Sequence, residues 1–177
     1  MTTPEHAQQL AAAIVAWLVD EQIIDDEQCD GCSGEGLCYR PGRHFMRACG
    51  GVETDASNGN YASHSTMVMN GMRVVTRRDV VINMQGQFGP VPCPRCGTPA
   101  PIDAFWQAGS DWCEGKTDVM QCQHCGQPSA LPHWVHPEAS FVVLAFEFWN
   151  WSPLSAQFIE AVRQRLGHRI SLIDGKL

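Results

Sequence analysis

The chain has 177 residues, of which 44% are hydrophobic and 18% charged, a composition typical of a folded globular protein rather than a disordered one. Its formal net charge of -7 is uneven, because residues 1–39 contain eight acidic residues and no lysine or arginine. Its nine cysteines are an odd number, which excludes a framework that pairs every cysteine in intrachain disulfides.

A helix is predicted near the start of the chain, over residues 4–24. Thr3 and Pro4 are a typical N-cap and first helical residue, and apolar side chains then recur on one helical face. The apolar run at 10–19 is shorter than the roughly 20 residues that span a bilayer, and no lysine or arginine precedes Arg40, whereas a secretory signal would require one. We therefore expect a cytoplasmic protein with no membrane partner, in which cysteine pairs stay reduced and bind metal.

A first group of cysteines lies within residues 29–49, where no helical or strand period is sustained. Cys29 and Cys32 form a CxxC pair that needs two more ligands to complete a zinc site. Cys38 and Cys49 are the nearest cysteines, with His44 as a substitute for either. The sequence thus predicts a second zinc knuckle made of Cys29, Cys32, Cys38 and Cys49. In the alternative interpretation, Cys38 or Cys49 is a small buried hydrophobic residue.

The run at residues 29–36 has the form CxxCxGxG and resembles one repeat of the cysteine-rich zinc region of DnaJ-type chaperones. That family uses four repeats, paired two per zinc, whereas this chain has one and lacks the J-domain with its His-Pro-Asp signature. The resemblance therefore implies a metal-binding turn, and chaperone function does not follow from it.

Two strands are predicted near residues 72–84, because β-branched residues are concentrated at 72–76 and 80–84. The polar residues between them predict a turn or an exposed bulge. A run rich in glycine and proline at 86–92 then ends this region before the second cysteine group.

Two CxxCG units follow, at Cys93 and Cys96 and at Cys122 and Cys125. The two-residue gap lets both sulfurs of a unit turn toward one ion, and the following glycine permits a tight turn. Four thiolates complete a tetrahedral shell and leave no position for water, which predicts a structural zinc site. At these residues the sequence resembles a zinc ribbon over about 90–130, which implies two knuckles on hairpin turns that clamp one zinc.

Cys113 is the cysteine left over when the two predicted sites are filled. It falls in the spacer between the ribbon knuckles, which we expect to be a loop. Acidic neighbours at 111 and 114 should raise its pKa, so that it is a spare thiol rather than a nucleophile.

The remaining elements are a buried strand at 141–149, a helix after the Ser152-Pro153 pair that ends at Gly167, and a last strand at 169–173. Together these elements predict an α+β fold. Residues 1–177 would form a single domain, with a mixed sheet flanked by N- and C-terminal helices and a zinc ribbon inserted at 90–130.

The function that the sequence favours is a cytosolic, zinc-binding, non-catalytic protein-interaction module. The acidic segment before Arg40 predicts a basic partner, as in an adaptor or an acidic inhibitor or immunity-type protein. Glycine-rich phosphate-binding, serine-hydrolase and kinase motifs do not occur in the chain. An enzyme is therefore disfavoured.

A first alternative is a nucleic-acid-binding zinc-ribbon protein that uses residues 39–47, where three arginines alternate with Tyr39 and Phe45. The acidic net charge opposes it, and the same arginines are able to pair with the acidic residues at 20–30. A second alternative is a metal-dependent enzyme in which His133 and His136, with Glu138, leave one coordination position open. The prolines on either side exclude the helix that HExxH sites use.

Overall fold

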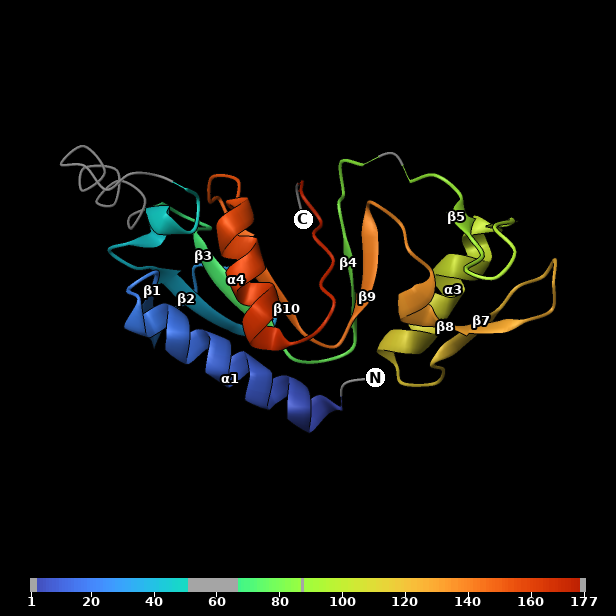
Figure 1. Cartoon of the computed structure of the whole chain (residues 1–177), viewed down its shortest axis with the longest axis horizontal. Helices are drawn as coiled ribbons and strands as arrows, with labels where there is room; N and C mark the ends of the chain where they lie inside the picture. The colour runs from blue at the N-terminus through green and yellow to red at the C-terminus, as the bar shows by residue number, and fades with distance from the viewer. Residues whose placement is uncertain (1–2, 51–66, 87, 176–177) are drawn as a thin grey trace. The chain divides into compact units, whose positions relative to one another are not determined.

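The computed structural model describes residues 3–50, 67–86 and 88–175 (Figure 1). The chain divides into two compact units. Unit 1 consists of Met1–Thr76 and Leu144–Ile170, and unit 2 of Arg77–Val143 and Ser171–Leu177. Each unit has its own cluster of buried hydrophobic residues. The segment predicted as the ribbon, 90–130, lies within unit 2.

In the residues of unit 1 that the structure describes, a four-stranded sheet is packed against two α-helices. The chain runs through α1 (Pro4–Asp20), β1 (Ile24–Gln28), β2 (Leu37–Pro41), the 3-10 turn η1 (Phe45–Arg47), β3 (Gly71–Val75), β10 (Ala145–Trp149) and α4 (Ala156–Leu166). The strand order is β1-β2-β3-β10, and each neighbouring pair is antiparallel. The α+β prediction is confirmed, with antiparallel strand pairs in place of a mixed sheet.

Local capping sets the ends of both helices. The Thr3 hydroxyl accepts a hydrogen bond from the His6 N–H at 3.2 Å, as the N-cap prediction requires. The helix ends at Asp20, earlier than predicted, because Gln22 adopts a φ of 55° that turns the chain into β1. Helix α4 is capped by Ser155 rather than by Ser152, and ends at Gly167 as predicted.

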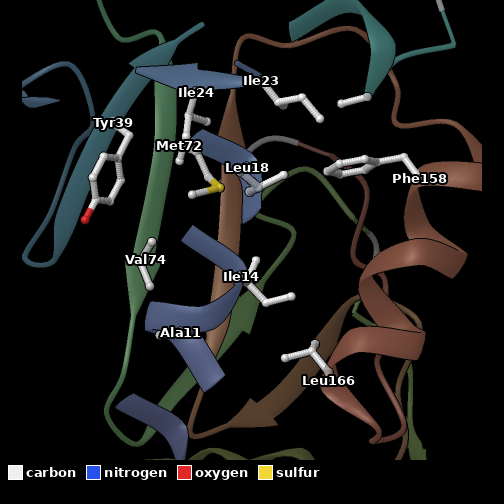
Figure 2. Packing of buried hydrophobic residues seen from close by; sticks show 11 residues of the cluster. Ala11, Ile14, Leu18, Ile23, Ile24, Tyr39, Met72, Val74, Phe158 and Leu166 are labelled. Atoms are coloured by element: carbon white, nitrogen blue, oxygen red, sulfur yellow. The ribbon is translucent and has the colours of Figure 1, made fainter. Parts of the chain in front are cut away.

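The core of unit 1 forms between the helices and one face of the sheet. Figure 2 shows Ile14 and Leu18 of α1 converging with Phe158 of α4 and with Met72 and Val74 of β3. Ile14, Leu18, Met72 and Val74 are at most 2% exposed. Burial of apolar surface stabilises a fold by about 25 cal/mol per Å², so this packing contributes to the stability of the unit.

The opposite face of the sheet carries a charged pair. The Arg73 guanidinium donates to both carboxylate oxygens of Glu147, at 2.7 and 2.8 Å, across the paired strands β3 and β10. The Trp149 indole N–H also donates to Glu147 at 3.3 Å. Glu147 is 7% exposed, so this pair is a buried one.

Over its described residues, unit 2 has three short antiparallel strand pairs, one α-helix and a 3-10 turn. The strands pair as β4 (Asp79–Ile82) with β9 (Ala139–Val142), β5 (Val91–Pro92) with β6 (Pro99–Ala100), and β7 (Val119–Gln121) with β8 (Pro128–Ala130). Helix α3 (Ile102–Cys113) lies between the last two pairs, and η2 (Leu131–His133) follows β8.

The strand predicted at 141–149 is in fact two strands. Its first residues belong to β9 in unit 2 and its last five to β10 in unit 1, with a bend at 143–144. Two buried strands in tandem have the same hydrophobic pattern as one long strand, so periodicity does not reveal the break. The strand predicted at 169–173 is wrong, because residues 169–174 adopt no regular structure.

Candidate metal centre

Two cysteine knuckles in unit 2 occupy the turns of two hairpins. Cys93 and Cys96 lie in the turn that joins β5 to β6, and Cys122 and Cys125 lie in the turn that joins β7 to β8. In both turns the glycine after the second cysteine has a positive φ, 73° at Gly97 and 69° at Gly126, and its N–H donates at 2.9 Å to the carbonyl of the first cysteine.

The four sulfur atoms have the spacing of a tetrahedral metal site. They all lie within 4.8 Å of one another. The Cys96 and Cys122 sulfurs are 3.8 Å apart, and those of Cys93 and Cys125 are 4.0 Å apart. Sulfurs that bind one ion at about 2.3 Å in a tetrahedron are about 3.8 Å from each other. The turns therefore already hold the four sulfurs at the separation that a metal ion requires.

Hydrogen bonds within the knuckles favour the thiolate form of Cys96 and Cys122. The hydroxyl and then the backbone N–H of Thr98 are the main causes that lower the pKa of Cys96, to about 5. The Cys125 N–H is the main cause that lowers the pKa of Cys122. At Cys125 the Gln127 N–H lowers the pKa, but burial and the neighbouring sulfurs outweigh it and raise the value to about 11. Four sulfurs this close do not all carry negative charge unless a cation lies among them.

The centre is continuous with the hydrophobic core of unit 2. Cys93 and Cys122 are 3% and 4% exposed and belong to the same buried cluster as Phe105 and Trp112 of α3. The outer knuckle position Cys96 is exposed. A metal bound here would link two hairpins whose strands are only two or three residues long, and would so contribute directly to the stability of the unit.

The helix between the knuckles was missed by the sequence prediction of a loop. Its signal is present in the sequence, because Phe105, Ala108 and Trp112 recur at helical spacing and all three are buried.

Comparison with protein-family models, curated proteins and solved structures found no match to this chain. The ribbon-like character of the site therefore rests on its own geometry, four cysteines on two hairpin turns.

The first cysteine group is arranged differently from the second. Cys32 and Cys38 are joined by a disulfide, and the Cys29 sulfur lies 3.4 Å from that of Cys38. Cys49 is placed elsewhere, since its thiol donates to the Ser152 carbonyl at 3.2 Å. The structure brings together three of the four residues of the predicted second knuckle, and metal binding there stays a prediction.

Cys113 is the last residue of α3 and lies exposed at its end. Its pKa is raised, first by desolvation and then by the Asp79 carboxylate. The predicted direction is right, but the charge responsible comes from β4 rather than from the sequence neighbours.

The histidines of the metal-enzyme alternative are in separate environments. His136 is 6% exposed and stacks on Phe88 with ring centroids 4.0 Å apart, and its Nδ1 accepts from the Glu138 N–H at 3.0 Å. His133 is exposed in η2, and the Glu138 carboxylate accepts from Asn83. Among the described residues, the groups with metal-ligand spacing do not include these side chains.

The nucleic-acid alternative depends on exposed rings at 39–47. Tyr39 and Phe45 are 7% and 0% exposed, so neither ring is available to stack on a base. Arg47 lies 3.8 Å from Glu21, as the intramolecular interpretation of these arginines expects.

Strand β1, the first of the four in the sheet order, concentrates acidic groups at the sheet edge. Asp25 is half-buried, and Asp26 and Glu27 are exposed. Desolvation and then the charge of Asp26 raise the pKa of Asp25, against a smaller opposing effect of Arg40. Negative charge is therefore crowded along this edge.

Among the described residues, no helix is both long and apolar enough to cross a membrane.

Proposed function

We propose that this protein is a zinc-binding, non-catalytic interaction module that binds a basic protein partner through strand β1. The observation that carries the proposal is the acidic strand at the edge of the sheet of unit 1. An edge strand offers unpaired backbone groups to an incoming segment, and its carboxylates select a segment rich in lysine or arginine. An adaptor or an acidic inhibitor of the immunity type would act in this way.

We assign Zn²⁺ to the four-cysteine centre, because a closed tetrahedral set of thiolates is the usual structural zinc site. Bound there, the ion would be held by Cys93, Cys96, Cys122 and Cys125 and would stabilise unit 2. The complete shell supports a structural rather than a catalytic role. A reducing compartment such as the cytoplasm suits these four free thiols.

The interaction is tested with a charge-reversed β1. A variant with Asp25, Asp26 and Glu27 changed to lysine should lose the partners that the wild type retains from a cell extract at low salt. The matched control changes Asp103, Asp111 and Glu114 of unit 2 to lysine, which alters the net charge equally and should retain those partners. Equal retention by both variants would reject the acidic edge as the docking surface.

A further inference from the structure

Three sulfur atoms of unit 1 gather where the loop after β1 meets β2 and β3. Cys29 directly follows β1, Cys38 is part of β2, and Cys32 lies between them. The Cys29 sulfur is 3.4 Å from that of Cys38, which is bonded to Cys32. A Cβ on Gly71 of β3 would lie 3.0 and 3.1 Å from the Cys38 and Cys32 sulfurs. The three sulfurs thus form one cluster, with Cys38 in contact with both of the others.

The backbone holds this cluster independently of the disulfide. The Cys29 N–H donates to the Cys38 carbonyl at 2.8 Å, and Cys38 is in register with Arg73 of β3. The loop lies so close to β3 that a Cβ on Gly31 would be 2.8 Å from the Asn70 carbonyl oxygen. These contacts hold Cys29, Gly31 and Cys38 whether or not the disulfide is formed, so we expect Cys32 to stay near the other two thiols after reduction.

The surroundings of the cluster favour a cation. Cys29 lines an open cavity of about 530 Å³ together with Gln28, Arg40 and three acidic residues, Asp25, Glu27 and Asp30, so that carboxylates outnumber the one arginine. Three sulfurs supply three of the four positions of a tetrahedral shell, and the cavity gives water access to the fourth.

We propose that in the reduced protein Cys29, Cys32 and Cys38 bind one Zn²⁺ as thiolates, and that oxidation to the Cys32–Cys38 disulfide releases it. In that oxidation Cys32 and Cys38 each give up one electron and a bond forms between their sulfurs. Hydrogen peroxide takes the two electrons together with two protons from solvent and becomes two water molecules. The structure shows the oxidised end of this reaction. The site is separate from the four-cysteine centre and does not depend on the docking function of β1.

The ligand set is tested by counting zinc in the full-length protein with native mass spectrometry under reducing conditions. The wild type should hold two zinc ions, and Cys32→Ser and Cys38→Ser one each. Cys49→Ser is the matched control and should keep both ions, because the Cys49 thiol donates a hydrogen bond to the Ser152 carbonyl and does not contact the cluster. The assignment would be overturned if Cys49→Ser lost one ion. It would also be overturned if the reduced wild type held a single ion and Cys96→Ser removed that ion.

Redox control is tested on the zinc-loaded wild type, which avoids any folding defect of a variant. Stoichiometric hydrogen peroxide should release one ion and leave the chain lighter by two hydrogen atoms, with the new bond mapped to Cys32 and Cys38. A reductant and added zinc should restore the second ion. Before oxidation, iodoacetamide should leave Cys29, Cys32 and Cys38 unmodified until a chelator is added. Their free alkylation in the zinc-loaded protein, or retention of both ions after the disulfide forms, would refute the proposal.

Discussion

Replacing Glu147 by glutamine should lower the free energy of unfolding of unit 1 by about 3 kcal/mol. The substitution keeps the shape of the side chain but leaves the Arg73 guanidinium, whose side chain is 14% exposed, without its counter-charge. Removing one partner of a buried pair typically costs about 3–5 kcal/mol, and the lower end applies here because the glutamine carbonyl still accepts one hydrogen bond. This change shifts the folding equilibrium by about two orders of magnitude.

Urea denaturation followed by tryptophan fluorescence and far-UV circular dichroism measures this effect. The double variant Arg73→Met with Glu147→Met removes both charges. Its free energy of unfolding should lie within about 1 kcal/mol of the wild-type value, because no uncompensated charge remains. Glu160→Gln breaks an exposed pair with Arg163 on α4 and should leave stability unchanged. A Glu147→Gln variant as stable as the wild type, or a double variant as unstable as the single one, would show that an uncompensated Arg73 charge does not destabilise unit 1.

The remaining predictions concern turns, thiols and the metal. Gly34 has a φ of 88°, and a Cβ there would displace the end of the Arg73 side chain, so Gly34→Ala should lower the free energy of unfolding, measured by urea denaturation, by about 2–3 kcal/mol. Gly97 has a similar φ but open space around it, so Gly97→Ala should lower the free energy of unfolding by only about 1–2 kcal/mol. Because its pKa is raised, Cys113 should be alkylated slowly at neutral pH, with a rate that still rises beyond the ordinary thiol pKa of 9.0. Asp79→Asn should speed that alkylation, and an unchanged rate would exclude the carboxylate as a cause. In the oxidised protein a chelator should lower the melting temperature in calorimetry, and should have no such effect on a variant with serine at one of the four ligand positions of unit 2.

Much of the fold was predictable because its signals are local. The caps at Thr3 and Gly167 and the paired CxxCG units depend on neighbours a few residues away. The location of α3 was readable from its apolar spacing as well, but the assumption that a ribbon spacer is a loop obscured it.

The division into two units was not predictable, because it depends on contacts between distant segments. The run at 141–149 is uniformly apolar, yet β9 pairs with β4 while β10 pairs with β3. The partner of a strand is set by tertiary packing, which hydrophobic periodicity does not encode. The same limit applies to the first cysteine group. Sequence proximity suggested Cys49 as a ligand, although its thiol donates a hydrogen bond to the Ser152 carbonyl instead.

The pairing of β3 with β10 links the order of folding in the two units. Val75 and Ala145 are directly paired although about 70 residues separate them in the chain. The entropic free energy of closing a loop of that length is about 2–3 kcal/mol less favourable than that of closing a turn of a few residues. Once β4 and β9 pair, with Asp79 opposite Val142, the same closure spans only the short connections on either side. Formation of unit 2 therefore turns a slow long-range encounter in unit 1 into a nearly local one, and conditions that fold unit 2 faster should speed the folding of the sheet as well.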